Sequence, residues 1–299
     1  IGALVHGFAR YKLGLKSAGV ILNRVSSDRH EAILRDALGR RVLGVVRHDD
    51  SLALPSRHLG LVQAEEHQQL ERFIEGAASA VAHETIFDRI LETATQPLGE
   101  SANRPSLRPL GQKIAIASDR AFAFAYPHLL QCWQRAGAEL SFFSPLANEA
   151  PDASADAVFL PGGYPELHAG RLSSNLSFLD GLRTARGLVY GECGGYMVLG
   201  ESLTVSDGTA YPMAGLLPVS TSFAARKLHL GYRQLKPLSG APWDSPLRGH
   251  EFHYSTVENE GEAERLFEVE DAAGEPLPSM GLRRGKIMGS YAHVICEVE

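Results

Sequence analysis

Residues 187–200 constrain the fold of this chain most, because they read as a strand, a sharp turn and a helix in direct succession. The apolar stretch 188–190 runs into Gly191, and Cys193 stands between that glycine and Gly194. Such a turn raises its central side chain, while glycines beside it leave space for a substrate. The pattern predicts an α/β domain with a nucleophilic cysteine, whose thiolate the helix N-terminus would favour. The alternative is a buried free cysteine next to a glycine-rich turn.

Two distant segments supply what a cysteine nucleophile needs. Residues 288–295 form a short strand pattern that carries His293, and a general base is commonly far from its nucleophile in sequence. Residues 159–166 place Gly162 and Gly163 after an apolar strand, where backbone N–H groups can face an oxyanion. Alone, the histidine also fits a structural role and the glycines a simple turn.

These segments together resemble the class I glutamine amidotransferase domain, in the branch found in cobyrinate a,c-diamide synthases. The resemblance covers nearly the whole chain and includes the strings Gly-Gly-Tyr-Pro-Glu-Leu-His at 162–168 and Gly-His-Glu-Phe-His-Tyr-Ser at 249–255. It also includes residues 19–25, 55–61 and 138–146. The family uses L-glutamine and ATP to convert two carboxylates of a corrinoid precursor, cobyrinate or hydrogenobyrinate, into amides.

The resemblance implies a role for each residue of the glutaminase site. Cys193 would attack the side-chain amide of glutamine, and His293 would take the thiol proton and then protonate the departing ammonia. Backbone N–H groups near Gly163 and of Gly194 would form the oxyanion hole. Ammonia would then pass by a shielded route to an amidating domain.

The residue that orients His293 is not evident, because the sequence departs from the family there. Many relatives carry Glu two residues after the histidine, and the matched branch carries a second His, but this chain has Ile295. Glu192 and Glu297 are the remaining candidates, so we expect a Cys-His dyad with an unassigned third partner. A second departure is His128-Leu129, where the family tends to have Glu-Asn.

The elements predict two open, mostly parallel α/β sheet domains. Residues 1–95 form the first, 96–111 a linker rich in proline and glycine, and 112–299 the glutaminase-like domain. Strands are expected at 18–22, 42–46, 113–117, 139–143 and 157–160, and helices at 27–38, 65–82 and 126–136.

The resemblance implies that the first domain is the C-terminal part of a dethiobiotin-synthetase-like amidating domain. The chain contains no G-x-x-x-x-G-K-[ST] phosphate loop, so we expect a fragment that begins after the main ATP and Mg²⁺ ligands and is at most a glutaminase by itself. Asn23 resembles the position that contacts adenine, or it caps its own backbone. Arg57 and His58 are candidate contacts to the corrinoid or nucleotide, or exposed loop residues.

The composition excludes several functional classes of protein. A net charge of −6 gives no reason to expect nucleic-acid binding, and no apolar run reaches the length of a membrane span. Three cysteines without a C-x-x-C pair suggest a cytoplasmic protein, and the family suggests a homodimer. His250 and His253 lie on opposite faces of a strand, so we expect no metal site there. Amidation of another tetrapyrrole such as nickel-sirohydrochlorin, a cysteine hydrolase and a non-catalytic binding module remain alternatives.

Overall fold

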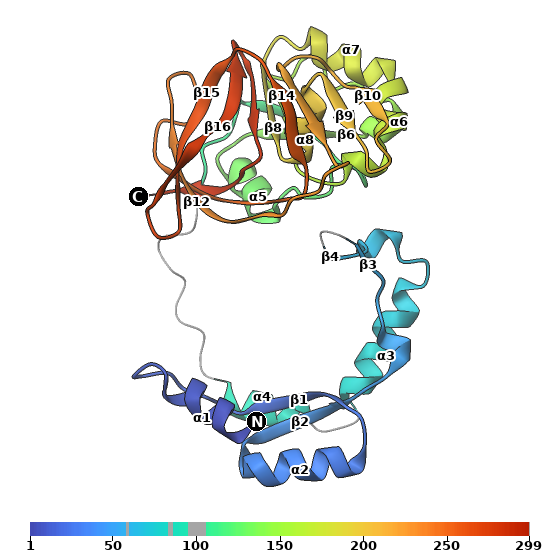
Figure 1. Ribbon diagram of the computed structural model, residues 1–299, viewed down its shortest axis with the longest axis vertical. Coiled ribbons are helices and arrows are strands. Elements are labelled where there is room, and N and C mark those ends of the chain that lie inside the picture. Colours follow the sequence, from blue (N-terminus) through green and yellow to red (C-terminus); the bar gives the residue numbers. More distant parts are fainter. Residues whose placement is uncertain (58–59, 83–85, 95–105, 299) are drawn as a thin grey trace. The chain divides into compact units, whose positions relative to one another are not determined.

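The structure is a computed structural model that describes residues 1–299 apart from 58–59, 83–85, 95–105 and 299. It separates into two compact units, Ile1–Ser101 and Ala102–Glu299, which are described one at a time (Figure 1). Most of the predicted linker 96–111 lies outside the described residues.

The first unit is built around a short parallel sheet. Its helices are α1 (Gly2–Arg10), α2 (Asp28–Leu38), α3 (Leu70–Ala82) and α4 (Ile86–Thr93), with 3₁₀ turns η1 (Gly39–Arg41), η2 (Asp50–Leu52) and η3 (Ala64–Glu66). Strands β1 (Val20–Val25) and β2 (Val42–Arg47) pair in parallel, and β3 (Ser56–Arg57) pairs antiparallel with β4 (Gly60–Leu61). The expected strands and the helix at 27–38 are confirmed to within a few residues.

Local chemistry accounts for the β1–α2–β2 segment. The Ser27 side chain accepts a hydrogen bond from the N–H of His30 and caps α2, which satisfies one of the free donors of its first turn. A small buried core joins these elements and comprises Leu22, Val25, Leu38, Val42 and Val45.

The prediction of a helix over 65–82 is wrong for its first residues. Residues 64–66 form a separate 3₁₀ turn, and α3 begins only at Leu70. The ring nitrogen Nδ1 of His67 accepts the N–H of Gln69, and this local bond competes with a continuous helix.

The second unit contains most of the chain's regular structure. Its α-helices are α5 (Pro127–Arg135), α6 (Ala169–Ser174), α7 (Leu176–Thr184) and α8 (Gly194–Leu199), with 3₁₀ turns η4 (Pro145–Ala147) and η5 (Pro165–Leu167). Its first strands are β5 (Lys113–Ala117), β6 (Glu139–Phe143), β7 (Ala157–Leu160) and β8 (Leu188–Glu192). The later strands are β9 (Ser202–Thr204), β10 (Ala210–Pro212), β11 (Val219–Ser222), β12 (His229–Pro237), β13 (Leu247–His253), β14 (Thr256–Glu260), β15 (Glu264–Asp271), β16 (Pro276–Arg284), β17 (Ile287–Ser290) and β18 (His293–Glu297).

Ten of these strands form one sheet in the order β18-β13-β12-β15-β16-β17-β8-β7-β5-β6. The half from β17 to β6 is parallel, whereas every pairing from β18 to β17 is antiparallel. A mostly parallel sheet was therefore the wrong expectation for this half, because hairpins rather than helical crossovers connect its strands. A second sheet has the order β10-β9-β11-β14.

The strand predicted over 288–295 is two strands. β17 ends at Ser290 and β18 begins at His293, yet these neighbours in sequence stand five strands apart in the sheet order. The antiparallel half therefore curls round until β18 returns to the end of β17. The break at residues 291–292 permits this turn, and it delivers His293 to the C-terminal edge of β8.

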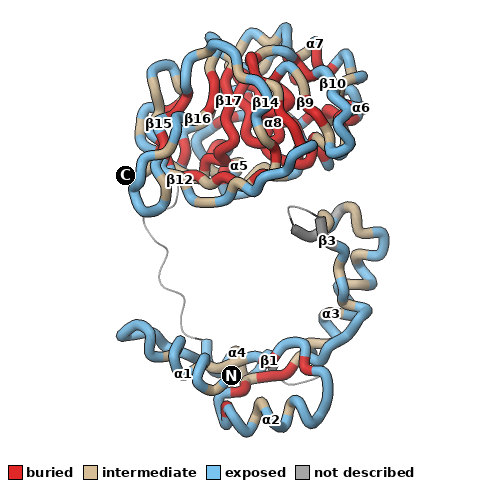
Figure 2. The backbone as a smooth tube through the Cα atoms, viewed as in Figure 1, coloured by how far each residue is buried: buried red, intermediate tan, exposed pale blue. Residues whose placement is uncertain are grey.

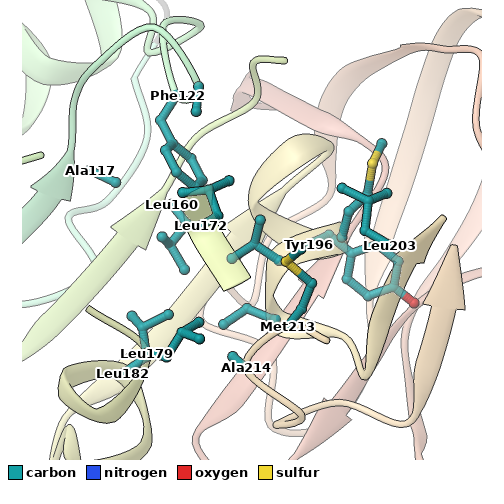
Figure 3. Close-up of a cluster of buried hydrophobic side chains, with 14 of the residues drawn as sticks. Ala117, Phe122, Leu160, Leu172, Leu179, Leu182, Tyr196, Leu203, Met213 and Ala214 are labelled. Carbon is teal, nitrogen blue, oxygen red and sulfur yellow. The ribbon is translucent and has the colours of Figure 1, made fainter. Parts of the chain in front are cut away.

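Alternating side chains divide the core of the second unit into two clusters, one on each face of the parallel strands. Ala115 and Val158 join the cluster that α6, α7 and α8 cover, while Ile116 and Phe159 join the one that Trp133 of α5 fills. Figure 2 shows this unit's buried interior, and Figure 3 shows Leu160, Leu172 and Tyr196 in the first cluster. Among the described residues, no helix is both long enough and apolar enough to cross a bilayer.

Candidate active site

Cys193 occupies the turn between β8 and α8. Its backbone has φ 47° and ψ −105°, a conformation that residues with a side chain rarely adopt and that holds the sulfur at the top of the sheet. The N–H of Cys193 donates to the carbonyl of Ser290 at 2.8 Å, so β17 fixes the turn. Gly195 lets α8 pack this closely, because a Cβ there would overlap the carbonyl oxygen of Leu160.

The thiol is protonated in the resting site. Burial, with a smaller contribution from the nearby Glu166, raises the pKa of Cys193 to about 12, and the N–H of Gly194 opposes this rise only in part. Loss of water around the sulfur opposes the expected thiolate more than the helix N-terminus favours it, so its formation stays a prediction for the substrate-bound site. The Sγ atom lies 4.0 Å from the carbonyl oxygen of Phe252.

His293 lies beside the nucleophile despite a separation of one hundred residues. A Cβ on Gly162 would overlap Cε1 of His293, would lie 3.1 Å from Nε2 and would lie 3.3 Å from Cβ of Cys193. One point in space therefore touches both side chains, and only a glycine leaves it open. Both residues are almost fully buried, at 1% exposure for Cys193 and 2% for His293.

His293 is a neutral imidazole in this environment. Burial, together with smaller contributions from the neighbouring His250 and His253, lowers its pKa to about 3. A neutral imidazole has a free lone pair and can accept the thiol proton when substrate arrives.

The two glycines predicted for the oxyanion hole lie together. The backbone nitrogen of Gly163 is 3.0 Å from the position that a Cβ on Gly194 would take. Gly194 opens α8, and the first N–H groups of a helix have no partner within the helix. The nucleophile lies beside the base, and the two backbone segments lie beside each other at the start of α8, an arrangement that suits attack on a carbonyl carbon.

Neither candidate carboxylate orients the His293 ring. Oε1 of Glu192 accepts the N–H of Val294 at 3.0 Å, so it holds the backbone of β18. Oε1 of Glu297 accepts the N–H of Arg108 at 3.1 Å. The Nδ1 atom of His293 is buried and has no hydrogen-bond partner in the described part of the chain.

Sequence reasoning missed two contacts of this site, His250 and Tyr126. The His250 ring stacks on that of His293 with the centroids 4.8 Å apart and the planes 2° from parallel, and the Tyr126 hydroxyl bonds to Nε2 of His250. The two departures from the family pattern also meet, since Nε2 of His128 lies 3.0 Å from the carbonyl oxygen of Ile295. The sequence does contain His250 in a strand pattern, but the pairing that places it opposite His293 could not be predicted from the sequence.

His229, Glu251 and His253 bring possible metal-ligand atoms within 4.8 Å of one another. The Glu251 carboxylate is already engaged, because the Arg233 guanidinium donates to Oε2 from Nε at 2.9 Å and from Nη2 at 2.7 Å, and His253 Nε2 lies 2.8 Å from Oε1. A metal ion here would face the guanidinium charge, so the cluster fits a buried ion pair better than a metal centre.

Of the candidate residues of the first unit, Asn23 is the one whose side-chain contacts the described part of the chain gives. Asn23 lies exposed in β1, and its Oδ1 accepts the N–H of Arg24 at 2.9 Å, which is the local backbone cap considered as its alternative. Arg57 is at the end of β3, and His58 lies outside the described residues.

Comparison with known proteins places the chain in a family. Residues 113–299 match the CobB/CobQ-like glutamine amidotransferase domain. A hydrogenobyrinate a,c-diamide synthase of Sinorhizobium sp is 56% identical over 303 residues, covering 99% of this chain and 70% of that protein. The synthase of Rhodobacter capsulatus is 50% identical over 297 residues, covering 97% of this chain and 68% of that protein. The chain therefore belongs to the hydrogenobyrinate a,c-diamide synthase family, whose members are glutamine-dependent amidating ligases of cobalamin biosynthesis.

Proposed function

We propose that the second unit hydrolyses L-glutamine at Cys193 and that the ammonia amidates the a and c carboxylates of hydrogenobyrinate. The observation that carries the proposal is the closeness of Cys193 to His293 beside Gly162, with the backbone of Gly163 next to Gly194. Family membership supplies the acceptor, since the similar synthases are named for hydrogenobyrinate.

The first half of the reaction expels ammonia. His293 takes the proton of the Cys193 thiol, and the sulfur attacks the side-chain amide carbon of glutamine to give a tetrahedral oxyanion. The N–H groups of Gly163 and Gly194 stabilise this oxyanion, and loss of one such donor raises a barrier by about 3 kcal/mol. The oxyanion collapses, the C–N bond breaks and the imidazolium returns its proton to the leaving nitrogen, which departs as ammonia.

The second half restores the enzyme. His293 removes a proton from water, the resulting hydroxide attacks the γ-glutamyl thioester, and glutamate leaves as Cys193 regains its proton. The buried position of both residues keeps water scarce during the first half.

We propose that residues 1–95 belong to an amidating domain of the dethiobiotin-synthetase type, joined to the glutaminase domain by 96–111. The described residues of this unit do not fit ATP and Mg²⁺ as a complete site. The sequence contains no phosphate loop, and the side-chain oxygen of Asn23 is used by its own backbone. The roles of Asn23, Arg57 and His58 stay predictions.

Replacement of the nucleophile tests the glutaminase assignment. In Cys193→Ala we expect glutamate release to fall to background, because the sulfur that forms the thioester is removed. Its matched control is Cys132→Ala, which removes a half-buried cysteine whose Sγ lies 3.7 Å from the carbonyl oxygen of Leu107. Undiminished glutamate release by Cys193→Ala would overturn the assignment, and cleavage of peptides but not glutamine would favour a cysteine hydrolase.

The acceptor is tested by mass spectrometry of products. Incubation of a synthase that includes this chain with ATP, Mg²⁺, glutamine and either hydrogenobyrinate, cobyrinate or nickel-sirohydrochlorin should give a diamide from hydrogenobyrinate. A diamide formed only from one of the metal-containing substrates would contradict the proposed acceptor.

A further inference from the structure

We propose that His250 is the positioning residue for His293, and that ring stacking does here what a carboxylate does in a Cys-His-Glu triad. The inference rests on the proposed glutaminase function, since it concerns the same base. It starts from Nδ1 of His293, which is buried and has no hydrogen-bond partner among the described residues. Something other than a hydrogen bond at that atom must hold the ring.

The strand register places His250 against His293. β13 and β18 are antiparallel neighbours, and His250 is directly opposite His293. Directly opposed side chains of an antiparallel pair lie on the same face of the sheet within contact distance. The two imidazole rings stack, with their planes 2° from parallel and their centroids 4.8 Å apart.

His250 is itself held in place by Tyr126. Burial raises the pKa of the Tyr126 phenol, so the hydroxyl stays protonated and can donate to Nε2 of His250. Burial also lowers the pKa of His250, which leaves that nitrogen free to accept. The bond fixes both the plane and the tautomer of His250, with its own proton on Nδ1.

The backbone of Gly162 also limits the His293 ring. Gly162 approaches so closely that a Cβ there would overlap Cε1 of His293. The ring is thus limited by the Gly162 backbone at Cε1 and Nε2 and by the His250 ring on one face, and the same Gly162 backbone lies close to Cys193. This confinement fixes the direction of the lone pair that receives the thiol proton.

The stacking of His250 on His293 also affects the protonation state of His293. The titratable groups around the His293 ring come from several elements: Tyr126 before α5, Glu192 and Cys193 at the β8–α8 turn, and His250 and His253 on β13. The His250 ring excludes water from one face of His293, and so it helps to keep the base neutral.

The test compares His250→Ala with His250→Phe in glutamate release by the 299-residue chain. His250→Ala should lower kcat about 10- to 100-fold with little change in KM, since loss of alignment of this order follows from small displacements of a base. It should also move the acid limb of kcat/KM upward toward pH 6.5, because the exposed imidazole protonates more readily. His250→Phe keeps a flat ring and should restore most of kcat and the original acid limb.

The matched control is His229→Ala on β12. His229 stacks on His253 with the centroids 4.6 Å apart and does not touch His293, so its loss should leave the acid limb in place. An unshifted acid limb and unchanged kcat in His250→Ala would overturn the inference. Equal loss in His250→Phe and His250→Ala would also overturn it, because a ring nitrogen would then be responsible. If His250→Ala does not fold, Tyr126→Phe supplies the test, with a smaller loss of kcat expected and no change contradicting the role.

Failure of this inference is separable from failure of the proposed function. If His250 variants behave as wild type while Cys193→Ala is inactive, the glutaminase stands and only the positioning role falls. If the wild-type chain releases no glutamate although Cys193 is alkylated by a glutamine-analogue affinity label, both fall.

Discussion

Burial moves the proton affinities of Cys193 and His293 in opposite directions. The pKa of the thiol rises to about 12 and that of the imidazole falls to about 3, so the resting pair carries no charge. Charge separation is deferred until glutamine supplies a carbonyl and the N–H groups of Gly163 and Gly194 have an oxyanion to bind. The free enzyme is accordingly expected to react slowly with small alkylating reagents that need a thiolate.

Glu192 gives a stability prediction at the same scale. Burial raises its pKa from 4.5 to about 8, so the folded protein keeps the carboxyl protonated where the unfolded chain has lost the proton. The folded-state pKa lies above the unfolded one, and stability from this group is full below pH 4.5 and is lost as pH rises through 8. Glu192→Gln cannot ionise and retains an oxygen for the Val294 N–H.

We therefore expect the urea concentration at the unfolding midpoint of the wild type to decrease as the pH is raised from 5 to 8.5. The midpoint of Glu192→Gln should decrease less over the same range. Glu201→Gln, at an exposed position, is the control and should follow the wild type. Parallel curves for Glu192→Gln and wild type would show that Glu192 is ionised in the folded state.

Helix α7 illustrates how elements are tied to the sheet. Phe178 is fully buried, and its ring lies 6.3 Å from that of Phe122 and 6.4 Å from that of Phe143. Phe178→Ala should lower the free energy of unfolding by about 3–5 kcal/mol, because it removes buried surface and leaves a cavity. Phe142→Ala on β6 is the control, since 56% of Phe142 is exposed. Equal losses for the two variants, measured by urea denaturation, would contradict this account.

The elements that sequence predicts well are those set by short-range patterns. The bounds expected at 113–117, 139–143 and 157–160 are the ones observed, because each is a short segment rich in apolar and aromatic residues that fits a strand. The interruption between β17 and β18 was not foreseen, since residues 291–292 are as apolar as their neighbours. Cys193 could be found from its glycines, whereas the role of His250 depends on the register of β13 with β18, which only the fold determines.

At the scale of the whole molecule, the two units differ in the size of their cores. The first unit buries five apolar residues in its cluster, while the second has two larger clusters on either side of its sheet. A small core leaves little stabilisation after the entropy cost of folding. We expect calorimetry to show two unfolding transitions, with the first unit melting at the lower temperature.

A chain of residues 102–299 should reproduce the higher transition alone. The same chain with Cys193→Ala serves as the control, since loss of activity should leave that transition in place. One cooperative transition for the 299-residue chain, absent from the shorter one, would contradict independent folding.

The return of β18 to the end of β17 has a kinetic consequence. The parallel strands that carry Cys193 depend on local crossovers, but the base arrives only when the antiparallel half has closed upon itself. Pairings between segments distant in sequence form late, because the chain between them must first be ordered. During refolding, recovery of glutamate release should therefore lag behind recovery of secondary structure. The delay between the two would report how fast β18 pairs with β13.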